Sequence, residues 1–506
     1  QRPYALSQPP GGDLLYHALT SCRSLIHFGR NKSTMIDALG YVVAGAPFVV
    51  AAVALVGMRL PAVWAGVAAL AAAVAGAFVW PGLDPSGLPL AFVEGSGTSA
   101  TVLYVLFGGL LLYNLLSAGG AIGDVSGFLG RLEPEKDALA VGVVVGVAPF
   151  FESVTGFGVA VVISAPILLA AGFSPLRAAV LASWGQCAVP WGALGVGTVI
   201  GADLSGMSFG ELSDWSALLS LPLFPVYAVA AAALAGGWAG LRWRGIEAAL
   251  LGIVAGTGTL LASAYAVPEL SGAAGGLAAT VAFLGLRWRR LLRGVGVPIR
   301  ALLSYAFLLA LLLAANGLGL LRELAKGLGP VFAGPGLPLL VSCAFAAALF
   351  GLGGSETSSA LVETLRQWVP TAGAVLTFVL AGQVIASSGA AAHLASGAAA
   401  FGGLYPAVAP VVGALGGWLT GSNAASNALF MPLQLEAARD VGIPETLTAA
   451  EQNVSGSHAS LLAPQRVVLA ATATGLLGRE GDITRAALPP VLASVAILSL
   501  IGLVVR

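Results

Sequence analysis

Long apolar stretches recur along this chain from Ile36 to its end, and only short polar connections separate them. A helix needs about 20 mostly apolar residues to cross the hydrocarbon core of a bilayer. Because unpaired backbone groups are costly in lipid, such stretches are expected to cross as helices. The sequence therefore predicts an all-α polytopic membrane protein with about 12 to 14 transmembrane segments, several of them too short to cross alone.

The composition agrees with this reading. The 506 residues are 58% hydrophobic and only 9% charged, which leaves too little polar surface for a set of soluble domains. The net charge of +0 gives no reason to expect nucleic acid as a partner, and the three cysteines show no CxxC spacing. Neither GxxxxGK[ST] nor HExxH occurs, so ATP hydrolysis and metalloprotease chemistry lack support. We expect no enzyme, no cofactor and no bound metal.

Charge and composition also divide the chain. Residues 1–34 mix Pro, Ser, Arg and His without apolar periodicity, and we expect a disordered N-terminal extension. The basic loops at Arg242 and at Arg287–Arg293 lie two crossings apart, while the loop near Glu269 between them carries no Lys or Arg. The positive-inside rule therefore places both basic loops in the cytoplasm, as in a multi-pass protein of the cytoplasmic (inner) membrane.

A weak internal repeat at an offset of 270 places Phe150–Gly158 opposite Thr420–Ala428. In each copy an apolar run stops at small and polar residues, and a short helix and a Gly or Pro turn follow. The alternative is that these small residues only allow close helix packing. We take the repeat to mark two transmembrane halves, residues 35–290 and 291–506, and expect the two polar segments to approach each other.

A second interruption is expected in each copy, at Gln186–Pro190 and at Gln452–His458. Irregular backbone is not tolerated where it faces lipid, so such breaks must be buried in protein or line a polar cavity. Paired interrupted segments in corresponding halves are typical of a transporter's central site.

Glu152 lies at the end of an apolar run, where a charged carboxylate is costly. Burial favours the protonated form of a carboxyl group, so Glu152 is expected to bind and release a proton. The alternative is a glutamate at the membrane interface. Glu451 and His458, in the most polar segment of the second half, are the other candidates for proton coupling, although His458 could equally be a packing residue.

Polar side chains and glycines follow the two apolar runs, and we expect them to bind a small anion. A helix N-terminus attracts anions, and neutral amides and hydroxyls suit a carboxylate with an adjacent hydroxyl. Arg466 could hold a carboxylate through a bidentate contact or could extend to the membrane interface. The expected substrate-binding residues are Ser153, Thr155, Gly156, Gln186, Ser422, Asn423, Ser426, Asn427, Asn453, Ser455 and Arg466.

At Phe150–Gly158 and at Leu419–Phe430 the chain resembles the L-lactate permease family. The family carries a Glu-x-x-x-Gly-Phe-Gly element and a Leu-Thr-Gly-Ser-x-x-x-Ser-Asn-Ala-Leu-Phe element. Further agreement lies at Gly192–Gly195 and from Ala463 to Gly478. The resemblance implies a symporter of protons with lactate, glycolate or a related 2-hydroxymonocarboxylate. It also implies two inverted repeats with re-entrant hairpins, and scaffold and transport domains that move like an elevator.

Two departures from the family pattern concern substrate recognition. The family's Asn-Thr-Ala-Pro element reads Gly185–Ala188 here, and a Gly-Lys-Met element falls near Ser460–Leu462, so its lysine is missing. Either Arg466 or His458 supplies the anion contact in this member, or the member carries a different carboxylate.

Three other functions remain open at this point. A sodium-coupled carboxylate carrier would use the same hairpin residues to coordinate Na⁺. A channel would need no coupling carboxylate, and a membrane enzyme is the most distant alternative. The expected partners are a small carboxylate (lactate or glycolate), protons and membrane lipid, without nucleic acid; a homodimer is compatible with the sequence.

Overall fold

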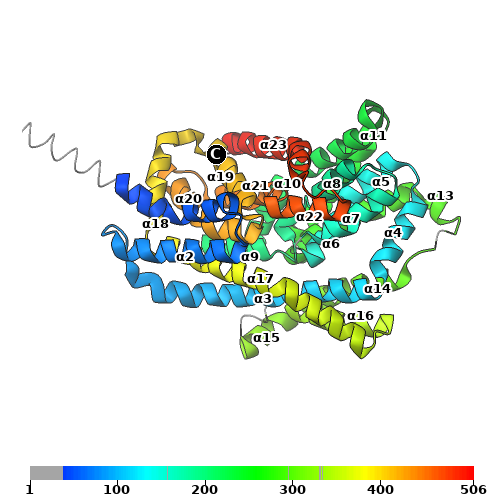
Figure 1. Ribbon diagram of the computed structural model, residues 1–506, viewed down its shortest axis with the longest axis horizontal. Helices are drawn as coiled ribbons and strands as arrows, with labels where there is room; N and C mark the ends of the chain where they lie inside the picture. The colour runs from blue at the N-terminus through cyan, green and yellow to red at the C-terminus, as the bar shows by residue number, and fades with distance from the viewer. Residues whose placement is uncertain (1–37, 157, 295, 330–331, 333, 506) are drawn as a thin grey trace, which may run out of the picture.

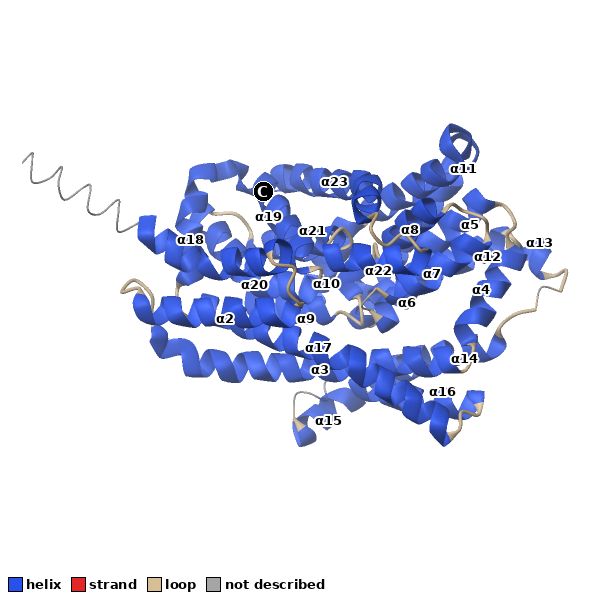
Figure 2. Ribbon diagram, viewed as in Figure 1, coloured by secondary structure: helices blue, strands red, loops and turns tan. Residues whose placement is uncertain are grey.

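The structure, a computed structural model, describes residues 38–156, 158–294, 296–329, 332 and 334–505. The described part is helical and contains no strand, which confirms the all-α prediction (Figure 2). The extension predicted for residues 1–34 lies outside the described residues, as does Phe157 in the first hairpin motif.

Ten helices in the described part are long and apolar enough to cross a membrane, and three shorter apolar helices accompany them. One of the ten, α11, is two segments. Its 43 residues bend at Gly237, where φ is 62° and ψ is −149°, a backbone conformation that glycine adopts without strain. Gly252 then packs against the backbone of Pro225 from the other side of the bend. The structure thus gives ten candidate spans where the sequence predicted 12 to 14, and whether the bent and short helices add crossings stays a prediction.

The described part begins with a helix at Ala38–Gly57 that ends in the π-helical turn η1 (Val53–Gly57). The first half then contains α2 (Ala62–Val79), α3 (Leu88–Ala118), α4 (Ala121–Leu132), α5 (Lys136–Gly142), α6 (Ala148–Thr155), α7 (Val159–Ala170), α8 (Pro175–Trp184), α9 (Val196–Ser205), α10 (Phe209–Ser220), α11 (Leu223–Tyr265), α12 (Ser271–Leu286) and α13 (Trp288–Leu291). The second half contains α14 (Ile299–Gly317), α15 (Leu320–Leu328), α16 (Gly336–Phe350), α17 (Gly354–Ser387), α18 (Ala390–Ala395), α19 (Tyr405–Thr420), α20 (Asn423–Val441), α21 (Glu445–Ser460), α22 (Pro464–Thr474) and α23 (Glu480–Val505).

The helices form two groups. The long helices α3 and α17 pack against each other and against α2 and α16 (Figure 1). The second group contains the short helices α6 to α9 and α19 to α22, and it contacts the first group mainly through α17 and α20. This division resembles the expected scaffold and transport domains; the elevator motion itself stays a prediction.

The order of the elements repeats in the second group. In the first copy, α6 ends at Thr155 and α7 begins at Val159, while in the second α19 ends at Thr420 and α20 begins at Asn423. The two helix ends are 265 positions apart rather than 270. The following helices α8 and α21 do begin 270 positions apart, because α20 is seven residues longer than α7 and the connections before and after it are each one residue shorter. The predicted repeat is therefore present, with a five-residue error at the tips.

The two predicted breaks had different outcomes. The first is confirmed, since α8 ends at Trp184 and α9 begins only at Val196. The second prediction was wrong: α21 runs unbroken through Gln452–His458, and the interruption lies at residues 461–463. The helix tolerates its polar residues because Ser455 and Ser457 donate to the carbonyls four residues earlier, at 2.6 and 2.7 Å.

Glycines bring the helices of the second group into backbone contact. Gly417 of α19 faces the backbone of Gly456 in α21, so closely that a Cβ atom at Gly417 would overlap that carbonyl group. Close approach of this kind is what small residues provide in membrane helix packing.

We expect Gly417→Ala to separate α19 from α21 and to destabilise the protein by about 1–3 kcal/mol. The matched control is Gly130→Ala in α4, where a Cβ atom would meet nothing within 4 Å. That control should stabilise the helix slightly, by about 0.5–1 kcal/mol. Thermal melting of the purified variants in detergent measures both, and equal melting temperatures would contradict the packing role of Gly417.

Candidate functional site

The two hairpin tips meet at one small cavity of about 40 Å³, as the repeat predicted. The first tip, the break after α8 and the start of α22 all contribute to its wall together with the second tip. The lining residues are Glu152, Gly156, Val189, Gly192, Val196, Gly197, Ser422, Asn423, Ala424 and Arg466.

Glu152 points from the last turn of α6 toward the N-terminus of α7, and its side chain is only 1% exposed. One carboxylate oxygen accepts a hydrogen bond from the N–H of Gly158 at 3.3 Å, and the other accepts from Ala160 at 3.4 Å. The N-terminus of a helix carries free N–H groups and a partial positive charge, so it stabilises a carboxylate. Glu152 is therefore buried at the tip rather than exposed at an interface.

Arg466 connects the two halves at this point. It lies in the first turn of α22, and its Nη1 contacts Oε1 of Glu152 at 3.3 Å and donates to the side-chain oxygen of Gln186. Its Nε donates to the carbonyl oxygen of Gly421 at 2.9 Å. Arg466 thus holds Glu152, the first break and the second tip together, and it does not extend to a membrane interface.

Gln465, the residue before this arginine, caps the C-terminal end of α19 at the second tip. Gln465 donates to the carbonyl of Thr420 at 2.5 Å, at the C-terminal end of α19. The turn that follows has Gly421 in the left-handed region (φ 63°) and Ser422 as the N-cap of α20, with its hydroxyl accepting from Ala425 N–H at 3.4 Å. These two residues explain why the chain turns sharply here.

The break after α8 caps the first tip. Ala193 and Leu194 have positive φ values of 43° and 57°, which non-glycine residues adopt rarely and at a cost of about 1–2 kcal/mol each. In this conformation the N–H of Ala193 donates to Glu152 O at 3.1 Å and the N–H of Leu194 donates to Ser153 O at 2.5 Å. The strained loop therefore satisfies the carbonyls at the end of α6, and strain of this kind is typical of functional sites.

A network of hydrogen-bonded asparagine side chains is buried next to the cavity. The hydroxyl of Thr198 determines which groups in it donate and which accept. Thr198 donates to the carbonyl of Pro190 at 2.6 Å, so its oxygen accepts from Nδ2 of Asn453 at 3.0 Å. Oδ1 of Asn453 must then accept, and it does so from Nδ2 of Asn423 and from Nδ2 of Asn427, each at 2.8 Å. Asn453, on α21, is the centre of the network.

This orientation leaves two amide oxygens without a partner. Asn427 also donates to the carbonyl of Gly197 at 2.9 Å, so both of its N–H groups are used. Oδ1 of Asn423 and Oδ1 of Asn427 are buried and have no hydrogen-bond partner among the described residues. Since Asn423 lines the cavity, the site presents an unpaired acceptor there, which would pair with a hydroxyl, a water molecule or a cation.

Four predicted hydroxyl residues are placed less favourably for substrate. Ser153 donates to Pro149 O at 2.8 Å, and Thr155 donates to Phe151 O at 2.6 Å, both within α6. Ser455 is back-bonded in α21 in the same way. Ser426 accepts from Gln452 at 3.1 Å inside the contact between α20 and α21. None of these four lines the cavity, whereas Gly156 and Ser422 do.

Glu451 and His458 lie away from the tips. Glu451 faces Gly502 of α23, and neither of its oxygens has a hydrogen-bond partner among the described residues. Nδ1 of His458 lies 3.1 Å from the hydroxyl of Tyr227, with the two rings stacked at a centroid distance of 5.3 Å. The structure therefore brings Glu152, but not these two, to the cavity.

The chain matches the L-lactate permease family over residues 40–291 and 330–506. It belongs to this family. An L-lactate permease of Streptococcus iniae is 27% identical over 385 residues, covering 69% of this chain and 80% of the relative. The L-lactate permease of Escherichia coli K12 is 25% identical over 450 residues, and the glycolate permease GlcA of the same strain is 24% identical over 458; each alignment covers 76% of this chain and 80% of the relative.

Membership of the L-lactate permease family confirms the resemblance seen at the two tip motifs, and it makes this chain a multi-pass transport protein of the cytoplasmic membrane. Among solved structures, the YdaH transporter of Alcanivorax borkumensis aligns with 83% of this chain and 87% of its own, at 18% identity and a TM-score of 0.42. A likeness of that size supports no argument about this chain.

Sequence reasoning missed several residues around this cavity. Thr198 and Gly197 on α9 and Ser216 on α10 complete the amide network, and Ser216 accepts from Asn453 at 2.8 Å. No motif marked them. The left-handed residues Ala193 and Leu194 follow the predicted break directly, so the break itself indicated their neighbourhood but not their role.

The segment Gly206-Met-Ser-Phe-Gly210 has the Gly-x-Ser-x-Gly spacing of a serine hydrolase, and the structure explains it differently. A nucleophile elbow needs a strand followed by a sharp turn into a helix. Here α9 precedes the segment, and Ser208 is the N-cap of α10, with its hydroxyl accepting from Glu211 N–H at 3.1 Å. This serine stabilises a helix terminus.

We expect Asn453→Ala to lower the melting temperature more than Asn423→Ala, because it removes every hydrogen bond at the centre of the network instead of one. Hydrogen bonds between membrane helices contribute about 0.6 kcal/mol each on average and about 1.7 at most. Ser455→Ala, on the same helix, is the control. The structural role of Asn453 fails if its variant melts together with the control.

Proposed function

We propose that this protein carries a small 2-hydroxymonocarboxylate, such as lactate or glycolate, across the cytoplasmic membrane together with one proton, and is not an enzyme. The observation that carries the proposal is the buried pair of Arg466 and Glu152 in a cavity lined by both hairpin tips. The named relatives add support, because their names specify permeases for L-lactate and for glycolate.

The proton and the substrate compete for the same arginine. With Glu152 ionised, its carboxylate holds Arg466. A proton on Glu152 removes that negative charge and releases the guanidinium, whose planar N–H groups bind a carboxylate in a bidentate geometry. Proton binding therefore creates the substrate site, and loss of the proton on the other side restores the pair and expels the substrate.

Charge balance makes the coupling strict. An uncompensated charge in a buried site is costly, so the site is stable only when Arg466 has one negative partner. Ionised Glu152 is that partner in the empty site, and the substrate carboxylate is the partner when Glu152 is protonated. Binding of the substrate alone would place two anions beside one cation, and binding of the proton alone would leave the cation unpaired. One proton per carboxylate, with no net charge moved, follows.

The unpaired amide oxygen of Asn423 supports a hydroxy acid as substrate. An acceptor without a partner repels a carboxylate oxygen but accepts a hydrogen bond from a hydroxyl. Asn423 and Arg466 line the same cavity, so a carboxylate on the arginine can place its 2-hydroxyl toward the amide. Gly156 and Ser422 form part of the remaining wall, and Gln186 accepts a hydrogen bond from Arg466 outside the lining.

The same unpaired oxygens favour one alternative, a sodium-coupled carrier. Amide oxygens of Asn423 and Asn427 are ligands that a hard cation accepts. In that case the coupling ion would bind at the amides, and Glu152 would remain ionised. Glu451 and His458, the other residues predicted for proton coupling, lie outside the cavity, and the proposed coupling does not use them. The domain division at residue 290, the elevator motion and the homodimer stay predictions.

Glu152→Gln tests the coupling. Wild-type protein in liposomes should accumulate radiolabelled lactate under an inward proton gradient, whether the external cation is Na⁺ or K⁺. The variant should lose this accumulation and retain at least part of the exchange of lactate for lactate, because the glutamine keeps the shape of the side chain without its proton.

Glu451→Gln is the matched control, since it removes a buried carboxyl group outside the cavity. If proton-driven accumulation persists in Glu152→Gln and vanishes in Glu451→Gln, the coupling residue is Glu451 and the proposed role of Glu152 is wrong. Accumulation in the wild type that requires Na⁺ would establish the sodium-coupled alternative.

Asn423→Ala tests the recognition of the hydroxyl group. Loss of a directed hydrogen bond costs about 1–3 kcal/mol, which is about one to two decades in affinity. The variant should bind lactate that much more weakly and should bind propionate, which lacks the hydroxyl, as the wild type does. Competition binding with both acids measures this, and an equal loss for the two would contradict a hydroxyl contact at Asn423.

A further inference from the structure

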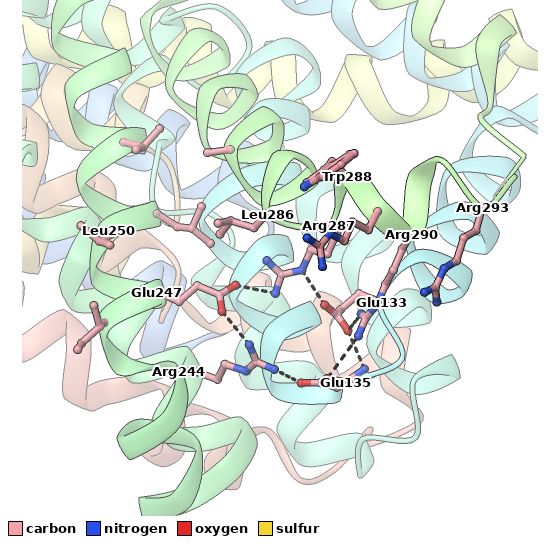
Figure 3. Close-up of a pocket in the computed structure, with 15 residues that line it drawn as sticks. Glu133, Glu135, Arg244, Glu247, Leu250, Leu286, Arg287, Trp288, Arg290 and Arg293 are labelled. Atoms are coloured by element: carbon pink, nitrogen blue, oxygen red, sulfur yellow. Dashed lines mark hydrogen bonds and ion pairs between the residues drawn. The ribbon is translucent and has the colours of Figure 1, made fainter.

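A network of ion pairs joins the part of α11 after its bend, the α4–α5 connection and the junction of α12 with α13, in the region that the positive-inside rule assigns to the cytoplasm (Figure 3). Arg287 pairs with Glu133 and with Glu247, each at 2.6 Å. Arg290 contacts Glu133 at 2.5 Å, and Arg244 contacts Glu247 at 2.9 Å and also pairs with Glu135. The three carboxylates that line the adjoining cavity are therefore all paired.

Two arginines that line the same cavity have no ion-pair partner among the described residues. Arg289 and Arg293 are exposed and make no ion pair with any residue that the structure describes, and Figure 3 shows Arg293 apart from the dashed contacts. The Arg289 guanidinium lies 5.7 Å from the ring centre of Trp288, which is 54% exposed. An exposed tryptophan beside arginine is typical of the level where a bilayer meets water.

The cavity itself has a volume of about 920 Å³ and an apolar wall. Ile246, Leu250 and Val254 follow one face of α11 at a spacing of four residues, and Ala282 and Leu286 line it from α12. On the surface of the protein, Ile246 is 79% exposed and Leu286 is 63% exposed. A hydrated anion would gain nothing from contact with these apolar side chains, whereas the acyl chain of a lipid would cover them.

We propose that this cavity binds one anionic phospholipid of the cytoplasmic leaflet. Its phosphate group lies against Arg289 and Arg293, and its acyl chains follow the apolar wall formed by α11 and α12. The paired arginines fix the shape of the floor, and the two unpaired ones supply the charge that a phosphate complements. Basic pockets between membrane helices on the cytoplasmic side recognise lipid head groups through this combination. Because α12 also packs against α6, which carries Glu152, the lipid would brace the helix that holds the coupling site.

The test uses the double variant Arg289→Gln/Arg293→Gln, which removes two charges without opening any ion pair. Arg242→Gln is the control, because Arg242 is also an arginine of the cytoplasmic loops without an ion-pair partner among the described residues, but does not line the cavity. Binding of phosphatidylglycerol and of phosphatidylcholine to the purified proteins in detergent is measured by native mass spectrometry, with inorganic phosphate as a third probe.

We expect the double variant to bind phosphatidylglycerol about 30-fold more weakly than the wild type, which corresponds to about 1 kcal/mol for each basic residue. The control should bind it as the wild type does, phosphatidylcholine should bind weakly to all three proteins, and high salt should weaken only the phosphatidylglycerol complex.

Equal retention of phosphatidylglycerol by the double variant and the wild type would overturn the proposal, as would an equal loss in the Arg242→Gln control. Displacement of the lipid by inorganic phosphate at matched concentration would show a site for the free anion and would also overturn it. Melting curves recorded without added lipid should coincide for the three proteins; a lower curve for the double variant alone would show that the two arginines are structural and would refute the assignment.

Discussion

The contact between Arg466 and Glu152 is the interaction on which the rest of this structure depends. The two residues are 314 positions apart and come from different halves of the chain. A charge buried among apolar helices is stable only beside an opposite charge, so neither half can hold its residue alone. The tips of both hairpins end on this pair, which places the backbone breaks of the two halves around one cavity.

Each tip also stabilises one member of the pair through its helix ends. The N–H groups at the start of α7 hold the Glu152 carboxylate, and the carbonyl of Gly421, at the end of α19, holds Arg466. Helix N-termini favour anions and C-termini favour cations, so the two hairpins present opposite partial charges to the site. The capping that folds the tips and the electrostatics that bind the charges are therefore the same set of contacts.

The sequence predicted the individual features of this site better than their connections. Apolar runs and the tip motifs identified the helices, the repeat and both charged residues, because each depends on local composition. The contact of Arg466 with Glu152 depends on how two distant segments pack, and no local pattern contains that information. The break expected at Gln452–His458 failed for a related reason: polar residues interrupt a helix only when their side chains compete with its backbone, and here Gln452 and Asn453 bond to neighbouring helices instead.

The direction of the hydrogen bonds beside the cavity further limits how a substrate can lie. The hydroxyl of Thr198 donates to the carbonyl of Pro190 at 2.6 Å, a closer contact than its 3.4 Å approach to Oδ1 of Asn453, and this orients Asn453 and, through it, Asn423. The amide side of the cavity then offers an acceptor, and the opposite side offers the donors of Arg466. In the proposed function, the substrate carboxylate lies against the arginine and its hydroxyl donates to the amide oxygen. A 2-hydroxy acid has these two groups on adjacent carbons, so one orientation satisfies both sides, and a molecule that lacks the hydroxyl leaves the Asn423 oxygen unpaired.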